Sequence, residues 1–197
     1  MSTGHPSNIP EQLRQLLDRS DLPALGPQSR PGARPGAQIE HEAKALLSKL
    51  ALSDRAQDLI RGTLLLWHDH LEAAHTIAQA IEDADGSLLH AIMHRRESDY
   101  WNSKYWFRRV GKHPCYPAIA NGIRALLKPE QTKLASAVIP GGVWDPFAFV
   151  DLCEKAAAGA AENEIRLLQE IQKLEIESFL DHLGSAKLGR SYTEAHK

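Results

Sequence analysis

The chain has 197 residues, of which 43% are hydrophobic and 24% charged, and its formal net charge is −2. This length suits one globular domain with a core, and the small net charge argues against a whole-protein field that draws the chain to nucleic acid or to an acidic membrane. No apolar run approaches the roughly 20 residues of a spanning helix, and residues 1–10 lack the apolar segment of a secretory signal, so we expect a cytoplasmic protein with no membrane partner.

The first 38 residues are rich in proline, glycine and serine, a composition typical of a linker. We therefore expect a flexible or loosely packed N-terminal extension over 1–38, with one short helix near 10–17. The helical pattern that follows predicts one helical domain over 39–184, which starts with a short helix over 39–51, and a C-terminal tail over 185–197.

Two long helices form the centre of the predicted domain. Ser53 is a suitable N-cap for a helix that continues to about Ile81. Its apolar residues recur at alternating steps of three and four, the spacing of one helix face: Ile60, Leu64, Trp67, Leu71, Ala74 and Ala78. The next helix is expected from Ser87 to Gly111, with Asn102 as a candidate interruption.

The second half of the domain is predicted to contain shorter helices and one long final helix. Prolines open helices over 117–127 and 129–138, and Asp145 followed by Pro146 is typical of an N-cap and the first helical position. The last helix, over 161–183, has apolar residues on more than one face, so it is either wedged between neighbours or used in a homodimer. No alternating strand pattern appears, which predicts an all-α fold, an antiparallel up-down helical bundle.

Histidine and glutamate recur in mirror order around the turn between the two central helices. Glu72 and His75 approach the turn, and His94 and Glu97 leave it at matching distances along the chain. If the flanking helices are antiparallel, the two histidines lie at one height and the two glutamates at another. Imidazole and carboxylate groups that converge from different elements are typical metal ligands, so these four residues are the predicted metal ligands.

The predicted site is mononuclear, and its metal is a divalent ion of iron, zinc or manganese. His68 and His90 flank the mirror and are candidates for a further ligand or a catalytic proton-transfer group. Di-metal carboxylate bundles also use Glu-x-x-His, but this chain has one such motif with a reversed partner, and bridging carboxylates would have to come from Glu170, Glu175 or Glu177. The alternative is a metal-free set of polar flanking residues that tunes helix packing.

A basic and aromatic segment occupies residues 94–114. It contains six lysines and arginines against two acidic residues, together with five tryptophan, tyrosine and phenylalanine side chains. Arginine beside aromatic rings can clamp an anion or stack on bases. The predicted substrate-binding residues, which would form a pocket wall for an anionic small molecule, are Arg95, Arg96, Trp101, Arg108 and Arg109. A nucleic acid is the less favoured partner, and a solvated charged face is the structural alternative.

Three runs of the chain are distinctive: His94-Arg95-Arg96-Glu97, then Lys104-Tyr105-Trp106-Phe107-Arg108-Arg109-Val110-Gly111 with His113-Pro114, and finally Trp144-Asp145-Pro146-Phe147. In these runs the chain resembles a group of uncharacterised microbial all-helical proteins, and the resemblance covers roughly residues 60–180. No activity is attached to that group, so the resemblance implies no catalytic role for any residue.

The sequence favours a small-molecule, metal-dependent enzyme with a His/Glu site on a helical hairpin and an arginine and aromatic pocket wall. Two alternatives stay open: a non-enzymatic protein that binds an anion or a nucleic acid, and a dimeric helical interaction module that pairs through residues 161–183. The chain shows no Gly-rich phosphate loop, no Gly-x-Ser-x-Gly elbow and no zinc-finger spacing that would indicate another chemistry.

Overall fold

The structure of this protein is a computed structural model, which describes residues 11–185. Over this range the chain forms α-helices and short 3-10 turns but no strand, which confirms the all-α class. The helices are α1 Glu11–Gln15, α2 Gly36–Leu47, α3 Asp54–Trp67, α4 Leu71–Ala78, α5 Ala84–Arg96, α6 Tyr100–Val110, α7 Tyr116–Leu126, α8 Thr132–Val138, α9 Pro146–Ala157 and α10 Glu162–Ser185. No helix within the described range is both long enough and apolar enough to cross a membrane.

The continuous helix predicted over 54–81 is wrong, because the chain breaks between α3 and α4. Asp69 lies in this break with φ of 68°, a left-handed conformation that ends a helix and that Asp tolerates better than most residues. The Nη2 group of Arg30 donates to the carbonyl of Trp67, which takes the place of the next helical hydrogen bond. A tertiary contact therefore stabilises a break that the apolar pattern does not reveal.

A similar break separates α5 from α6. Ser98 has φ of 63°, and the carboxylate of Asp99 accepts a 3.2 Å hydrogen bond from the backbone N–H of Asn102. Asp99 is thus the N-cap of α6, three residues before the interruption expected at Asn102. The predicted end of this helix at Gly111 is confirmed.

Most other predicted helix boundaries agree with the structure. Ser53 accepts a hydrogen bond of 3.2 Å from Ala56 N–H, and Asp145 accepts from the first turn of α9, whose first residue is Pro146. Other boundaries differ. The helix predicted over 39–51 is α2, Gly36–Leu47. Helix α5 begins before Ser87, because the Asp83 carboxylate accepts from the N–H groups of the two residues after Ala84. The carboxylate of Asp83, four residues upstream, therefore takes the place of the predicted Ser87 cap.

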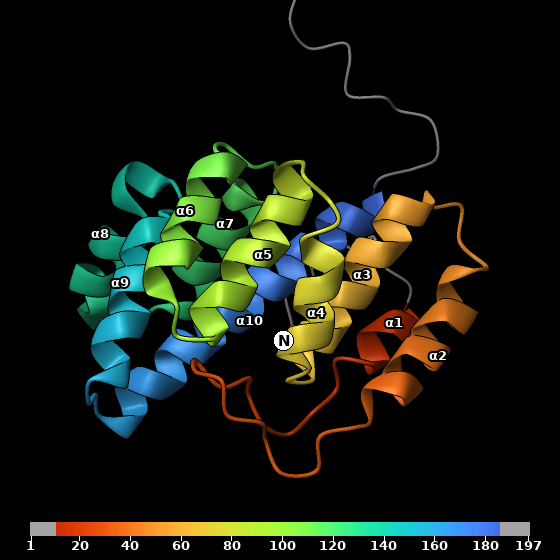
Figure 1. The fold of residues 1–197 in the computed structure, drawn as a ribbon. Coiled ribbons are helices and arrows are strands. Elements are labelled where there is room, and N and C mark those ends of the chain that lie inside the picture. The colour runs from red at the N-terminus through yellow and green to blue at the C-terminus, as the bar shows by residue number, and fades with distance from the viewer. Residues whose placement is uncertain (1–10, 186–197) are drawn as a thin grey trace, which may run out of the picture.

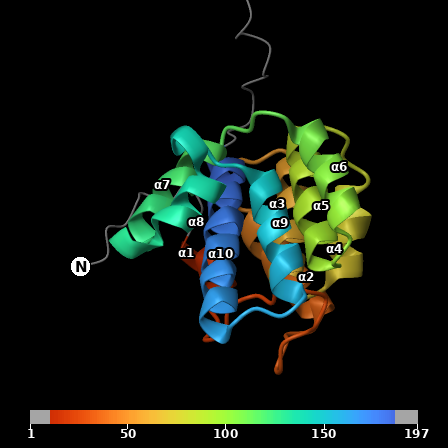
Figure 2. The same ribbon diagram turned by 90° about the vertical axis from the view of Figure 1, so that its left-hand side faces the viewer.

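Helix α10 runs the length of the molecule, with α7 and α8 on one side and α3 and α9 on the other (Figure 2). Its side chains Ile171, Ile176 and Phe179 are fully buried. Leu174, on the second apolar face, packs on the core and approaches the backbone of Gly122. The two apolar faces of α10 are therefore explained by helices on both sides, as expected for a wedged helix.

The N-terminal segment packs on the helical core, in contrast to the loose packing that its composition favoured. Leu13, Leu16 and Leu17 belong to the buried core. The carbonyl of Ala24 accepts a 2.9 Å hydrogen bond from Gln172 of α10, which ties the irregular stretch to the centre of the fold. Figure 1 shows this stretch running beneath the helices before α2 begins. Residues 1–10 and nearly all of the predicted tail lie outside the described residues.

Candidate metal site

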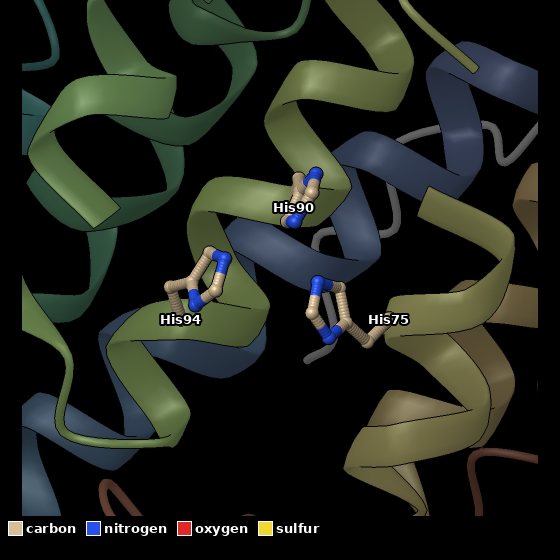
Figure 3. Close-up of side chains that lie close together, drawn as sticks. All are labelled: His75, His90 and His94. Atoms are coloured by element: carbon tan, nitrogen blue, oxygen red, sulfur yellow. The ribbon is translucent and has the colours of Figure 1, made fainter. Parts of the chain in front are cut away.

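Helices α4 and α5 bring three histidines together. His75 comes from α4, and His90 and His94 lie one turn apart on the same face of α5 (Figure 3). One ring nitrogen of each histidine lies within 4.8 Å of those of the other two. The ring centroids are 4.7 to 5.1 Å apart. This grouping brings together the two histidines of the sequence mirror and adds His90, one of the two candidates for a further ligand.

Small side chains on α4 allow this approach. Ala74 and Ala78 are almost fully buried, so α4 can lie close to its neighbours while His75 reaches past its edge. The turn between α4 and α5 is also tightly packed, because a Cβ on Gly86 would lie 1.9 Å from the carbonyl oxygen of Ile81. The residue at position 86 must therefore lack a side chain for α5 to begin where it does. The hairpin geometry that positions the histidines follows from these small residues.

The surroundings of two of the three rings, His90 and His94, favour the neutral form. Burial, together with the nearby His94 and His75, lowers the pKa of His90 to about 3. Burial also lowers the pKa of His94, although Glu97 acts in the opposite direction. Neutral imidazole is the form that binds a metal. In addition, Nδ1 of His90 is buried without any hydrogen-bond partner, an unsatisfied position that a ligand would satisfy.

Carboxylates and an amide surround His94. Its Nδ1 lies 3.2 Å from Oε2 of Glu97 and 3.9 Å from Oδ2 of Asp99. The side-chain amide nitrogen of Asn102 lies 3.1 Å from Nε2. A carboxylate on one ring nitrogen fixes the orientation of a histidine and raises its basicity as a ligand, the usual outer support of a metal site. Glu97 therefore occupies a supporting position beside His94.

Aromatic rings cover the other side of the cluster. The indole of Trp106 stacks on the ring of His90, with centroids 3.9 Å apart and planes at 18°. The guanidinium carbon of Arg109 lies 5.1 Å from the Trp106 ring. Trp106, which was not among the predicted site residues, lies within the aromatic run of α6 and could be recognised by that run alone.

Two of the predicted polar residues lie away from the cluster. Glu72 is exposed in the first turn of α4 and is not part of the histidine group. His68 is buried in the break after α3, where its Nε2 lies 2.6 Å from the carbonyl of Leu16. The break at this point separates His68 from the helix that carries His75. The structure thus assigns His68 to the attachment of the N-terminal segment.

The predicted arginines divide into two groups. Arg95 and Arg96 are fully buried and form ion pairs with Glu175 and Asp69. Their guanidinium groups are occupied inside the protein and do not line a surface for a substrate. Glu175 is likewise used by Arg95 and is not part of the histidine group, so it does not serve there as a bridging carboxylate. By contrast, Arg108, Arg109 and Trp101 are exposed along α6.

A second polar cluster joins Asp85, His113 and His182, whose ligand atoms also lie within 4.8 Å of one another. Both histidines contact Oδ1 of Asp85 through Nε2, at 2.8 and 2.9 Å, and Arg55 donates to Oδ2 at 2.7 Å. The N–H of Cys115 donates to Nδ1 of His113 at 3.2 Å. Nδ1 is therefore an acceptor, and Nε2 carries the proton that it donates to Asp85.

This tautomer distinguishes the two clusters. A protonated Nε2 has no lone pair for a metal, and the carboxylate of Asp85 already accepts from three groups without one. The Asp85 cluster is thus satisfied as a hydrogen-bonded clamp between α5, α10 and the segment before α7. The histidine cluster on α4 and α5 has the unsatisfied nitrogen and is the better candidate for a metal. Sequence analysis missed the clamp because its members are far apart along the chain.

Cavities lie elsewhere in the structure. One of about 340 Å³ lies between α8, α9 and α10, and another of about 280 Å³ lies beside residues 24–28 and the start of α6. None of the predicted site residues lines either of them. Within the histidine cluster, His75 is half-buried, whereas His90 and His94 are buried.

No family model, curated protein or solved structure matches the chain. These comparisons therefore assign no activity to the chain. A fold by itself does not define a function, so the chemistry depends on the histidine cluster and its surroundings.

Proposed function

We propose that His75, His90 and His94 hold one divalent metal ion and that the protein is a metal-dependent enzyme acting on a small molecule. The observation that carries the proposal is the convergence of three ring nitrogens within 4.8 Å, from two helices. The lowered pKa of His90 and its buried Nδ1 without a hydrogen-bond partner support it, because neutral imidazole is the form that binds a metal. Glu97 supports His94 from outside the group.

The donor set favours some metals over others. Imidazole suits zinc, copper, iron and nickel, whereas manganese prefers carboxylate and water ligands. No carboxylate belongs to the histidine group, so zinc or ferrous iron fits better than manganese. Three protein ligands leave a fourth position for water, which is the arrangement of catalytic rather than structural zinc sites.

Water at that fourth position defines the reaction class. Zinc lowers the pKa of bound water to about 7, which supplies hydroxide at neutral pH. The released proton would pass to solvent near the carboxylates of Glu97 and Asp99, which lie beside His94. The hydroxide would attack an electrophilic carbonyl or phosphoryl centre of the substrate. The bond from that centre to the leaving group would break, and the leaving group would take up a proton from solvent. Hydrolysis of a small molecule is therefore the activity that this site supports best.

Metal content tests the proposal directly. Tag-free protein is stripped with a chelator, reloaded with zinc, desalted and measured by elemental analysis. We expect one zinc ion per chain, and its loss in His75→Ala and in His94→Ala. His41→Ala is the matched control, because His41 is exposed on α2 and belongs to neither cluster. Full zinc content in the double variant His75→Ala/His94→Ala would refute the proposal, as would loss of zinc in His113→Ala alone.

A further inference from the structure

One face of α6 is exposed and carries an unusual set of side chains. Trp101, Tyr105, Arg108 and Arg109 follow at the spacing of one helix face, and we call them the α6 strip. Trp101 is 74% exposed and Tyr105 40%. Within the described residues, the one other exposed large hydrophobic side chain is Val143. Two exposed aromatic rings one turn apart are thus a local feature of α6 and not a general property of this surface.

The aromatic rings of the strip connect to the histidine cluster. The rings of Trp101 and Tyr105 are nearly parallel, with an angle of 13° and centroids 6.3 Å apart. Tyr105 meets Trp106 edge to face at 5.4 Å, and Trp106 stacks on His90 at 3.9 Å. A molecule seated on the exposed rings would therefore lie next to the candidate metal site.

The positive charges of the strip are available for a ligand. No hydrogen bond or ion pair joins the guanidinium of Arg108 or Arg109 to another side chain in the described part of the chain, apart from the contact of Arg109 with the Trp106 ring. Lys104 on the same helix differs, because it pairs with Asp151. From Tyr105 to Arg109 the rise along the helix is about 6 Å, so a cation lies close to the rings.

We propose that the α6 strip binds a nucleotide, with the base stacked on Trp101 and Tyr105 and the phosphate held by Arg108 and Arg109. Bases stack on exposed aromatic rings, and guanidinium groups bind phosphate through paired hydrogen bonds. An aliphatic anion would leave the rings unused. If the strip instead paired with the same strip of a second protein chain, the arginines of the two strips would lie against each other and repel. Presentation of the nucleotide to the histidine site rests on the proposed function, but binding to the strip does not.

The test uses metal-free full-length protein and isothermal titration calorimetry with adenosine monophosphate, adenosine and inorganic phosphate. We expect the monophosphate to bind more tightly than either fragment. Trp101→Ala should lower the affinity for both adenosine monophosphate and adenosine by at least about fivefold, which is the effect of losing one stacking ring. Arg108→Ala/Arg109→Ala should lower the affinity for adenosine monophosphate and leave the affinity for adenosine unchanged. Val143→Ala and Arg166→Ala are the controls, because both side chains are exposed outside α6.

The outcomes separate the strip from the metal site. Equal binding by the native protein and by His75→Ala/His94→Ala supports a strip that works without metal, even if the zinc measurement fails. A single-stranded oligothymidylate serves as a further probe. If it binds more tightly than the monophosphate and is affected by the same variants, the strip recognises a nucleotide within a single strand. Absence of monophosphate binding at millimolar concentration overturns the proposal. So does a Trp101→Ala variant that changes only the oligomeric state.

Discussion

The ring of His90 lies flat against the indole of Trp106, with centroids 3.9 Å apart and an angle of 18° between the planes. The ring of His94 also stacks on the ring of His90, with centroids 4.7 Å apart and an angle of 16° between the planes. The orientation of His90 is therefore set by packing before any metal arrives. Packing that locks a ligand in place reduces the ordering cost of binding and is how a site is held in its productive geometry.

Removing the stack should weaken zinc binding. In Trp106→Leu the His90 ring loses its flat support, so we expect zinc affinity to fall by about tenfold, the lower end of the effect of outer-shell changes at metal sites. Trp106→Phe keeps an aromatic face against His90 and should lose much less zinc affinity than Trp106→Leu. Competition against a chromophoric chelator measures the affinity. Trp101→Leu is the control on the same helix and should leave zinc affinity unchanged, since its ring is not in contact with His90.

The two glutamates of the sequence mirror should behave differently. Glu97 lies 3.2 Å from His94, whereas Glu72 is exposed and outside the group. We expect Glu97→Gln to lower zinc affinity by about 10- to 100-fold, because the supporting carboxylate of a histidine ligand is lost. Glu72→Gln should have no effect on the same chelator competition. Equal losses of zinc affinity in both variants would restore Glu72 as a ligand and would contradict its position outside the histidine cluster.

The hairpin of α4 and α5 shows how much of the site the sequence predicts. The mirror spacing placed His75 opposite His94, because both residues lie in regular helix on either side of one turn. The spacing did not decide which neighbouring side chain joins them. His90 joins because it lies one turn from His94, and Glu72 stays outside because it faces solvent. Helix periodicity gives heights along an axis, but small differences in helix rotation decide which groups meet.

The breaks and buried charges could not be predicted from local pattern. Asp69 ends the first central helix because Arg30 and Arg96 converge on its carboxylate, from 39 and 27 residues away. Arg95 was predicted to bind a substrate because it lies in the basic and aromatic segment, yet its partner Glu175 lies 80 residues further along the chain. Long-range ion pairs of this kind leave no periodic signal. The boundaries capped by Ser53 and Asp145 were predictable because the capping contact is local.

Stability should depend on Asp85 in a pH-dependent way. Burial would raise the pKa of Asp85, but hydrogen bonds from His113, His182 and Arg55 outweigh it and hold the pKa far below its usual range. A carboxylate with a lowered folded pKa stabilises the protein above its unfolded pKa of about 3.9, and this contribution is lost as the pH falls below that value. The acid unfolding of the native protein should therefore steepen below about pH 4.

The variant Asp85→Asn should remove this contribution. We expect the free energy of unfolding at neutral pH to fall by about 3 kcal/mol, because a largely buried charge network loses its acceptor. Its dependence on pH below about 4 should also be weaker than that of the native protein. Urea unfolding across a pH series measures both quantities. Asp58→Asn removes the exposed partner of Arg61 and should cost less than about 1 kcal/mol. Parallel pH curves for native protein and Asp85→Asn would contradict the assignment.

The ion pair of Arg95 and Glu175 ties the histidine-bearing helix α5 to α10. Both side chains are fully buried, and the Arg95 guanidinium also lies 4.5 Å from the Phe149 ring. Glu175→Gln leaves a buried cation without its counter-charge, so we expect a loss of about 3 to 5 kcal/mol in the free energy of unfolding. The matched control is Glu170→Gln, which breaks the exposed pair with Arg166 on the same helix and should cost less than about 1 kcal/mol.

The apolar double variant separates the charge from the packing. Arg95→Met/Glu175→Leu removes both charges and roughly preserves volume, so its stability should be far closer to that of the native protein than the stability of Glu175→Gln. Urea unfolding of all three proteins decides this. If the double variant loses as much as Glu175→Gln, the contribution comes from shape and from the hydrogen bond that Arg95 donates to Gln172. If the double variant is stable and still binds zinc, the buried pair is not needed to position His94, and the hairpin alone organises the site.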